Sequence, residues 1–508
     1  MERLTEALAR QARERPAALS LIDDRVRLSW SEVAAWVARA AGWLRERGLP
    51  RGAPVLGWLP NCAEWYLLRL ACEQAGLFWI PVPAGQGRRE LTSIAERARP
   101  AALVSRGRFR ERDYVAECDE ICAQLDAQPL RITVPDDGLL RLDGAPDDGG
   151  AALRLDEAAH ALSTTGSEGT PKLAVYTLAA ACQRAPAQAR LLGLKAGDII
   201  LVLSHGTGPA RAAWLAAPLA GSCVIGMPVF GSDAALRLIE REAVTIVCGT
   251  PAQLVMLAQK LGGVDTSTVR IWYTAGSVLP PTLASELEAA THGIVLSAYG
   301  AADFGGWAAP DPSAPPAVRH HTVGQPRGGT EFRIVGVDGR EVAAGATGEL
   351  IGRGPCCVTD FLGQQGRDQW RDGWFHTGDL ASFDGDGNIT ISGRLTELIT
   401  RGGDKINAME IEALLRTHPA VAQVAVIGVP DPVLGERICA CVVPAALTGQ
   451  IDLEVLRRHV HQHGLAPYKA PERIVILDAM PVVGDKIDRR ALAAQWAGQQ
   501  ASLAPITK

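Results

Sequence analysis

Residues 271–300, IWYTAGSVLPPTLASELEAATHGIVLSAYG, decide the fold class of this chain. An apolar run at Ile271–Thr274 is followed by a helical pattern at Pro281–Ala290 and by a second apolar run at Ile294–Leu296. A strand, a helix and a strand at this spacing are typical of a βαβ unit, whose two strands lie parallel in one sheet. Ligands bind at the carboxyl ends of such strands, so the residues that follow Leu296 are the first candidates for a functional site.

The same alternation begins well before this stretch. Apolar runs at Ile199–Leu203, Cys223–Met227 and Thr245–Cys248 precede it, and a helical pattern covers Pro251–Lys260. Strands that alternate with helices of this length predict a parallel sheet with helices on both faces. Because residues 1–300 alternate in this way throughout, we expect parallel-sheet βαβ subdomains over most of the chain.

The pattern changes twice toward the C-terminus. From about Val318, short alternating runs between Gly and Asp turns predict a small antiparallel barrel or sheet. After Arg394 the pattern is mixed. Helices are expected at Met409–Thr417 and Leu453–His463, and strands at Val421–Val429, Cys439–Val443 and Arg473–Leu477. The predicted fold is α/β: residues 1–394 form two parallel-sheet subdomains and a small β-barrel-like subdomain, and residues 395–508 form a small, mobile α+β domain.

The composition is that of a globular chain with material for a large core, since 47% of the 508 residues are hydrophobic and 21% are charged. The net charge of −5, without a long basic run, argues against a general nucleic-acid or membrane-surface binder. No apolar window is long enough to span a membrane, and Met1–Glu6 is charged. The odd count of 11 cysteines, without a C-x-x-C pair, argues against a zinc site. We expect reduced thiols in a cytoplasmic protein.

The strongest local motif is Ser163-Thr164-Thr165-Gly166-Ser167-Glu168-Gly169-Thr170-Pro171-Lys172. Its hydroxyls and backbone N–H groups can donate to phosphate oxygens, its glycines allow close approach, and its lysine supplies a positive charge. The spacing differs from G-x-x-x-x-G-K-[ST], so the motif is not that of a P-loop NTPase. A surface turn rich in Ser, Thr and Gly is the alternative.

Two further motifs follow strand-like runs. In Ser297–Asp303, Tyr299 can stack on a purine, and Asp303 can hold a magnesium ion through its oxygens. In Trp374–Leu380, Asp379 between Gly378 and an apolar residue can accept hydrogen bonds from two vicinal ribose hydroxyls. Taken singly, the first could be a simple turn and the second an Asp that caps a turn.

Two charged segments complete the set, Gly393–Glu412 and Gly484–Arg490. Each could be a solvated surface segment by itself. The order and spacing of all five motifs make that explanation unsatisfactory for the set as a whole.

With these five motifs in this order, the chain resembles the adenylate-forming superfamily of acyl- and aryl-CoA synthetases, nonribosomal-peptide adenylation domains and firefly-type luciferases. The resemblance covers nearly the whole chain. Gly169–Leu173, Gly300–Asp303 and Arg401–Asn407 look most like the aryl-acid AMP ligases, and benzoate-type CoA ligases are close to that branch.

The resemblance implies a two-step reaction that uses ATP and Mg²⁺. A carboxylate would attack the α-phosphate to give an acyl-adenylate and pyrophosphate, and a thiol would then displace AMP. The implied substrate is an aryl or cyclic monocarboxylic acid, and the thiol belongs to CoA or to the phosphopantetheine of a separate acyl carrier protein. No nucleic-acid or membrane partner is implied, and the oligomeric state cannot be read from the sequence.

Family roles transfer to matching positions of this sequence. The β- and γ-phosphates would be held by Thr164, Thr165, Gly166, Ser167, Gly169, Thr170 and Lys172. The nucleotide would contact Gly276, Ser297, Ala298, Tyr299, Gly300, Asp379 and Arg394, with Tyr299 on the adenine and the last two on the ribose. Asp303 stands where the family has its magnesium-ligating Glu. Lys486 would be the catalytic lysine that bridges the substrate carboxylate and the nucleotide.

The resemblance also places an acyl pocket and a thiol channel. The pocket residues would be His205, Gly206, Ala275, Gly276 and Ala302, with His205 also assigned a catalytic role at the pocket mouth. After adenylation the C-terminal domain would rotate about Thr396, and Gly402, Gly403 and Lys405 would line the thiol channel. A core histidine is the alternative for His205.

The small residues Gly206, Gly208, Ala275 and Gly276 predict a roomy pocket for a ring or a bulkier carboxylic acid. Dihydroxybenzoate ligases usually carry Asn where this chain has Gly206, which argues against a salicylate-like acid. Since Ser204–Gly208 and Thr274–Ser277 contain no Lys or Arg, a monocarboxylate is favoured.

The chain departs from the family at four places. Glu168 replaces a Thr, Asp303 replaces a Glu, and Thr396 stands at a hinge that is normally Asp or Lys. The loop before Lys486 is one residue shorter and carries Asp485 where Gly is usual. Two other functions therefore stay open: adenylation of an unusual acid, including nitrite for diazotisation, and a non-catalytic relative that binds nucleotide or an acyl ligand.

Overall fold

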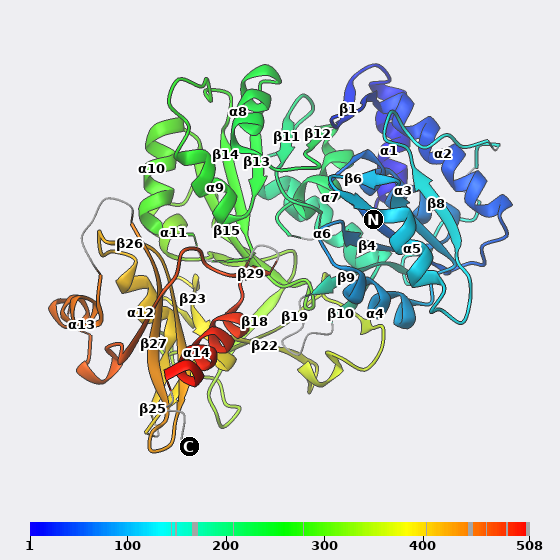
Figure 1. Ribbon diagram of the computed structural model, residues 1–508. Helices are drawn as coiled ribbons and strands as arrows, with labels where there is room; N and C mark the ends of the chain where they lie inside the picture. The colour runs from blue at the N-terminus through cyan, green and yellow to red at the C-terminus, as the bar shows by residue number, and fades with distance from the viewer. Residues whose placement is uncertain are drawn as a thin grey trace. The chain divides into compact units, whose positions relative to one another are not determined.

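The computed structural model describes the chain except for short gaps (Figure 1). The described residues are 1–143, 145–147, 150–164, 171–206, 208–277, 279–402, 404–445, 451–463, 465–483 and 486–503. They form two compact units, each described here by itself. The larger unit contains residues 1–332, 352–376 and 387–389, and the smaller unit contains residues 333–351, 377–386 and 390–508. The predicted domain boundary between residues 394 and 395 stays a prediction.

A nine-stranded sheet contains the stretch that decided the fold class. Its spatial order is β17 (Gln325–Arg327), β16 (Trp307–Ala309), β15 (Ile294–Gly300), β14 (Ile271–Ala275), β13 (Ile246–Gly249), β11 (Ile199–Val202), β12 (Cys223–Gly226), β1 (Leu19–Ile22) and β2 (Arg27–Ser29). The strands from β15 to β1 pair in parallel, whereas β16, β17 and β2 add antiparallel edges. The predicted parallel sheet is confirmed.

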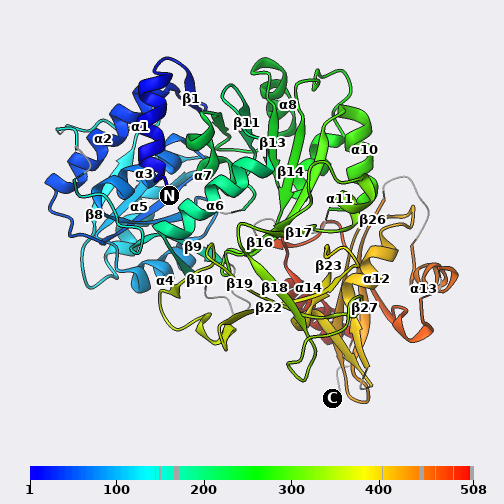
Figure 2. The ribbon, with the colours of Figure 1, turned by 180° about the vertical axis from the view of Figure 1, so that it is seen from behind.

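Helices join these strands and cover the sheet. They are α7 (Arg211–Ala220), α8 (Ser232–Arg241), α9 (Pro251–Ala258), α10 (Pro281–Thr291) and α11 (Pro316–His321). A capping box of Thr250 and Gln253 and a proline at the first position start α9, which explains why the sequence pattern located this helix. Leu236, Leu254 and Leu287, from α8, α9 and α10, pack in one cluster with Val247 and Trp272 of the sheet. Figures 1 and 2 show α8, α9 and α10 beside these strands.

A seven-stranded sheet makes the second parallel layer of the larger unit. Its order is β20 (Asp360–Phe361), β10 (Lys172–Thr177), β9 (Ala158–Thr164), β4 (Phe78–Pro83), β3 (Pro54–Leu59), β5 (Ala102–Arg106) and β8 (Leu130–Val134). The strands from β9 to β8 run parallel, and β10 returns antiparallel to β9. The remaining elements here are α1 (Leu4–Glu14), α2 (Trp30–Glu46), α3 (Ala63–Ala75), α4 (Arg88–Ala98), β6 (Arg108–Phe109), β7 (Arg112–Asp113), α5 (Tyr114–Cys122) and α6 (Leu178–Leu191).

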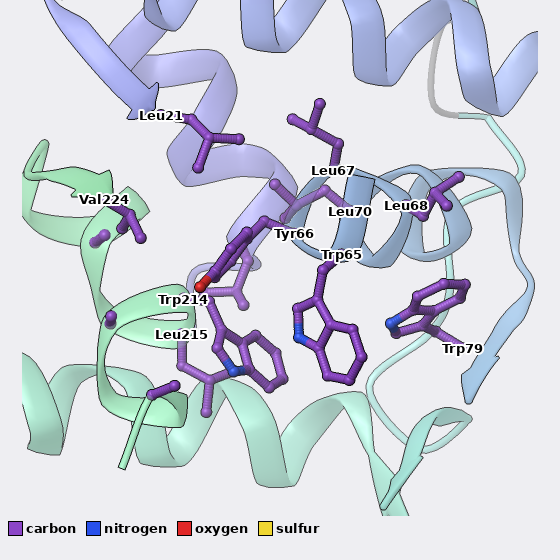
Figure 3. Close-up of a cluster of buried hydrophobic side chains, with 14 of the residues drawn as sticks. Leu21, Trp65, Tyr66, Leu67, Leu68, Leu70, Trp79, Trp214, Leu215 and Val224 are labelled. Carbon is purple, nitrogen blue, oxygen red and sulfur yellow. The ribbon is translucent and has the colours of Figure 1, made fainter. Parts of the chain in front are cut away.

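A shared core lies between helices that belong to these two sheets. Trp65 of α3, Trp79 of β4 and Trp214 of α7 are all buried, together with Leu67 and Leu215. Figure 3 shows Trp65 and Trp214 side by side. Helix α3 is buried around nearly its whole circumference, which is expected of a helix in the interior of a large unit.

Residues 331–394 contain the small β region that the sequence predicted. A five-stranded sheet has the order β18 (Glu331–Val335), β19 (Gly348–Arg353), β22 (Trp374–Phe383) and β21 (Trp370–Arg371), with β23 (Ile389–Arg394) paired to β22. Two short 3-10 helices, η1 (Arg367–Gln369) and η2 (Leu395–Glu397), lie next to it in the chain.

The C-terminal region is a compact α+β fold. A sheet of β25 (Asp404–Asn407), β24 (Leu398–Arg401), β27 (Gly435–Pro444), β26 (Val421–Asp431) and β28 (Arg473–Ile476) is accompanied by α12 (Ala408–Leu415), α13 (Leu453–Gln462), η3 (Pro467–Lys469), β29 (Val482–Val483), β30 (Lys486–Ile487) and α14 (Arg489–Leu503). Ile411 and Leu456, from α12 and α13, pack on one side of the β26–β27 ladder, and Leu492 from α14 packs in a second cluster with Cys439 and Cys441. The predicted α+β character is confirmed.

Gly57 on β3 tests the packing of the larger unit. A Cβ atom at this position would lie 2.0 Å from the ring of Trp79, which is fully buried. Because neither the strand nor the indole can move freely, we expect Gly57→Ala to destabilise the protein by about 1–3 kcal/mol.

Thermal unfolding measures this effect. The matched control is Gly85→Ala, since an added Cβ at Gly85 meets nothing within 4 Å, and its unfolding temperature should stay that of the wild type. Equal unfolding temperatures for the two variants would contradict the packing described here.

Candidate functional site

The hairpin of β9 and β10 frames the predicted phosphate-binding motif. Thr164 and Lys172 are paired directly across its two strands. The residues between them that were predicted to bind phosphate lie outside the described residues: Thr165, Gly166, Ser167, Gly169 and Thr170, together with the unusual Glu168. The structure thus places the two ends of the motif opposite each other where the chain passes from β9 to β10, and the role of the motif stays a prediction.

Lys172 is held by two side chains from distant parts of the chain. Its Nζ donates a hydrogen bond to Oδ2 of Asp303 at 3.1 Å and a second one to Oε1 of Gln369. Gln369 also donates from Nε2 to the carbonyl of His376 at 3.2 Å. The structure therefore brings together the predicted phosphate-binding lysine and the predicted metal ligand.

No sequence motif indicated Gln369. It lies in η1, outside every motif, and only the folded chain brings it beside Lys172.

The segment Ala302–Gly305 is anchored by side chains of the β10–α6 region. The hydroxyl of Tyr176 donates to the carbonyl of Ala302 at 2.7 Å, and Nη1 of Arg184 donates to the carbonyl of Gly305 at 2.7 Å. With the Lys172–Asp303 pair, these bonds hold the turn after β15 against the second sheet.

The ends of β14 and β15 place several predicted residues next to one another. Ala275 pairs with Ala298, and the preceding Thr274 pairs with Ser297. Gly276 follows with a φ of +100°, a conformation that favours glycine, and an added Cβ there would meet nothing within 4 Å. The predicted acyl-pocket and nucleotide-binding residues of these strands are thus neighbours at the carboxyl end of the sheet.

Tyr299 continues this edge. Its ring contacts Phe332 edge-on, with 6.0 Å between the ring centroids, and Gly300 pairs with Trp307. An aromatic face here suits stacking on a purine, which stays a prediction.

The segment of His205 and Gly206 differs from the sequence-based expectation. His205 is half-buried, whereas Gly206 is buried and its carbonyl accepts a hydrogen bond from Nε1 of Trp214 at 2.7 Å. A Cβ at Gly206 would lie 2.2 Å from Nε1 of Trp65. The prediction that Gly206 leaves open space is therefore wrong, because two indoles fill it, whereas Gly208 and Gly276 do border open space.

The smaller unit brings together the two predicted ribose-binding residues. Nε of Arg394 lies 2.8 Å from Oδ1 of Asp379, whose side chain is almost fully buried. The amide of Asp379 donates to Oγ1 of Thr377 at 3.0 Å, and Oγ1 of Thr377 donates to the carbonyl of Leu350 at 2.6 Å. Asp379 is thus a rigidly held, buried carboxylate with a cation beside it.

The other predicted residues of the smaller unit lie on turns. Lys486 begins β30, and its backbone pairs with Val483 in a two-stranded hairpin, although residues 484 and 485 and the side chain of Lys486 are outside the described part. Gly402 has a φ of +58° and donates from its backbone to Leu434 at 2.8 Å. Gly403 and the side chain of Lys405 are not described, and Thr396 lies in η2.

A magnesium ion fits Asp303 as a single carboxylate ligand. Among the described residues no group of three or more His, Cys, Asp or Glu side chains could hold a metal ion. Mg²⁺ is commonly bound through one or two carboxylates together with substrate phosphates, so the donor set is compatible with a metal that arrives with ATP. In addition, no helix within the described ranges is long and apolar enough to cross a membrane.

Comparison with known proteins identifies the family. The family model of AMP-binding enzymes matches residues 8–361, and that of the AMP-binding enzyme C-terminal domain matches residues 410–484. The chain belongs to the AMP-binding enzyme family. Its members in this comparison are named as ligases and synthetases, and the fold predicted from the sequence agrees with theirs.

Two relatives and one solved structure are informative. The chain is 32% identical to a 2-hydroxy-7-methoxy-5-methyl-1-naphthoate–CoA ligase of Streptomyces carzinostaticus, over 96% of this chain and 92% of the relative. It is 31% identical to a salicyl-AMP ligase of Mycobacterium tuberculosis, over 97% and 90%. The ATP-bound structure of MatB from Rhodopseudomonas palustris superposes with a TM-score of 0.85 at 23% identity, over 97% of this chain and 99% of that chain, which supports the fold.

Substitution of Tyr176 tests whether its hydroxyl holds the turn after β15 in place. Its buried hydroxyl donates to Ala302 and accepts from Nη1 of Arg211 at 3.3 Å. Tyr176→Phe leaves both groups unpaired, and we expect a loss of about 1–3 kcal/mol in the free energy of unfolding.

Thermal or urea unfolding of Tyr176→Phe measures this loss. Tyr468→Phe removes the same hydroxyl at an exposed position and serves as the control. If the two variants unfold alike, the Tyr176 hydroxyl does not anchor the turn.

Proposed function

We propose that this AMP-binding enzyme activates an aryl or cyclic carboxylic acid with ATP and transfers the acyl group to a thiol of CoA or of a carrier-protein phosphopantetheine. The observation that carries the proposal is the Lys172–Asp303 pair at the end of the β9–β10 hairpin. It joins a cation suited to phosphate with a carboxylate suited to Mg²⁺, in a chain matched by both AMP-binding family models.

In the first step, a carboxylate oxygen of the acid attacks the α-phosphorus of ATP. The new bond is P–O to the acid, the broken bond is the P–O bond to the β-phosphate, and pyrophosphate leaves with its electron pair. Lys172 would hold the leaving phosphates, and Asp303 would hold the Mg²⁺ that neutralises their charge. When ATP binds, the phosphates would replace Asp303 and Gln369 as partners of Lys172.

The nucleotide would be positioned by groups that are already ordered. Tyr299 would stack on the adenine, and the buried carboxylate of Asp379 would accept hydrogen bonds from the ribose hydroxyls. Arg394, whose Nε lies 2.8 Å from Oδ1 of Asp379, would hold that carboxylate in place. Lys486 would bridge the substrate carboxylate and the nucleotide, because a cation between two anions reduces their repulsion.

In the second step, a thiol attacks the carbonyl carbon of the acyl-adenylate. A C–S bond forms, the C–O bond to AMP breaks, and the thiol proton goes to solvent or to a nearby base. Gly402, Gly403 and Lys405 would line the route of the thiol, and Thr396 would act as the hinge. The free cysteines of the described chain are all buried, and we place the reaction in the cytoplasm, where thiols stay reduced.

Acid-dependent exchange of labelled pyrophosphate into ATP tests the first step. We expect exchange with some members of a panel of benzoates and alicyclic acids. Fatty acids and nitrite are tested in parallel to distinguish the alternatives. Lys486→Ala should lower the exchange rate by on the order of 10²-fold or more, because the transition state loses its bridging cation.

Lys260→Ala is the control for this variant, since Lys260 is exposed and its Nζ pairs with Asp233, outside the predicted site. Exchange that survives in Lys486→Ala would contradict the role of Lys486. Exchange with nitrite alone would favour diazotisation, and no exchange with any acid would favour a relative that only binds its ligands.

Asp379 tests nucleotide binding independently of catalysis. Asp379→Asn removes the charge that accepts from the ribose and pairs with Arg394, so we expect AMP to bind about 10–100-fold more weakly by calorimetry. Asp338→Asn makes the same change on an exposed turn and should bind AMP as the wild type does. Unchanged affinity in Asp379→Asn would show that the ribose is bound elsewhere.

A further inference from the structure

Four buried side chains form a basic cluster in the larger unit. They are Arg69 of α3, His160 of β9, Arg184 of α6 and Arg211 of α7, with exposed fractions of 3%, 0%, 8% and 5%. Residues of this type are almost never fully buried unless they are paired. We call this set the arginine cluster.

Each arginine lies over an aromatic ring. The guanidinium carbon of Arg211 is 4.6 Å from the ring centre of Tyr176, that of Arg69 is 4.9 Å from Trp214, and that of Arg184 is 4.9 Å from Trp307. Contacts of this kind stabilise a cation but leave its N–H groups free to donate in the ring plane.

Several N–H groups of the arginine cluster have no hydrogen-bond acceptor among the described residues. Nη1 of Arg184 donates to a carbonyl and Nη1 of Arg211 donates to the Tyr176 hydroxyl, so both partners are neutral. Nε of each of these arginines is buried and has no hydrogen-bond partner within the described residues. Neither ring nitrogen of His160 has one either, although its ring stacks on Tyr176 with 4.9 Å between centroids.

The charge of the cluster is also unbalanced. The single carboxylate that the described chain hydrogen-bonds to it is Glu73, at 3.3 Å from Nη1 of Arg69. Burial and the neighbouring arginines hold the pKa of His160 well below its usual value, so it is neutral. Burial and repulsion by Arg211 lower the pKa of Arg184 to about 10. Three guanidinium groups thus face one carboxylate in a buried region, which is unfavourable unless another anion joins them.

The cluster adjoins the predicted acyl pocket. Tyr176 joins Arg211 to the carbonyl of Ala302, and Trp214, which lies under Arg69, donates to the carbonyl of Gly206. The pocket segments add two buried hydroxyls, Oγ of Ser204 and Oγ1 of Thr274, that have no hydrogen-bond partner in the described structure. The arginine cluster is thus linked through Tyr176 and Trp214 to two residues of the predicted acyl pocket.

We propose that the acid taken by this enzyme carries a second anionic oxygen group, such as a second carboxylate, which binds to Arg211 and Arg184 at the inner end of the acyl pocket. This inference rests on the proposed function and specifies its substrate. The reacting carboxylate stays at the nucleotide, and the second group supplies the anion that the arginine cluster lacks. The two oxygens of a carboxylate can accept several hydrogen bonds, and the unpaired Nε groups of Arg184 and Arg211 are donors of the right kind.

The sequence favoured a monocarboxylate because the two pocket segments contain no Lys or Arg. Arg211 lies just after the first segment, on α7, and Arg184 comes from α6. Folding brings both to the pocket, so the cations were not visible in the motifs themselves.

Pairs of isosteric acids test the proposal by pyrophosphate exchange. The ortho, meta and para benzenedicarboxylates are compared with their monocarboxamides, and the sulfobenzoates with their sulfonamides, because each pair has the same shape and differs in one charge. The wild type should prefer the charged member of at least one pair by about tenfold or more in kcat/KM.

Arg211→Met should bring the ratio of kcat/KM for the charged member to that for the neutral member down to about one, and this ratio is the readout rather than the absolute rates. Arg190→Met, at an exposed position of α6, should keep the wild-type ratio. A general loss of structure would lower both members of a pair equally, so the ratio reports the contact itself, and the wild-type ratios stand even if Arg211→Met does not fold.

The outcomes separate the two proposals. Equal exchange rates with the neutral and charged members would overturn the proposal that the substrate carries a second anionic group. The arginine cluster would then have a structural role, and the proposed adenylation of an acid would still stand. No exchange with any acid would overturn the proposed function, and the inference with it.

Discussion

The ion pair between Lys172 and Asp303 joins the two sheets of the larger unit at the turn that follows β15. Lys172 begins β10 of the seven-stranded sheet, and Asp303 follows β15 of the nine-stranded sheet. Tyr176 and Arg184 hold the same turn through the carbonyls of Ala302 and Gly305. Because hydrogen bonds to charged groups are stronger than neutral ones, this pair fixes the turn that carries both the candidate metal ligand and part of the acyl pocket.

The same pair keeps the site ready for an anionic ligand. A lysine that is paired with a carboxylate and an amide is already oriented, so phosphate oxygens can replace these partners without ordering the side chain anew. The released carboxylate is then available to a cation. In the proposed function, a chain with a net charge of −5 would bind a polyanion through local cations, although its overall charge would not attract that polyanion.

Most of the fold could be predicted because its signals are local. The runs at Ile199–Leu203 and Ile271–Thr274 are strands within a residue or two of the predicted ends, and Pro251 marks the start of α9 as expected. β15 extends past its apolar run through Tyr299 to Gly300, because these last two residues pair with the antiparallel strand β16.

The parts of the site that could not be predicted depend on distant contacts. Gln369 reaches Lys172 from a 3-10 helix outside every motif, and Trp65 fills the space beside Gly206 from a helix far earlier in the chain. The arginine cluster is assembled from α3, β9, α6 and α7. A motif in the sequence indicates which functional groups lie within one segment. These features arise only when distant segments pack together, so no motif contains them.

In the proposed function, one site holds the acyl-adenylate, in which the acid and adenosine monophosphate are joined in a single molecule. Calorimetric titration with an aroyl adenosine sulfamate, a stable mimic of the acyl-adenylate, tests this directly. We expect a dissociation constant at least about 10²-fold below those of AMP and of the free acid. The mimic makes the contacts of both halves, whereas it loses translational and rotational freedom only once. A mimic that binds no more tightly than AMP would contradict the proposed function.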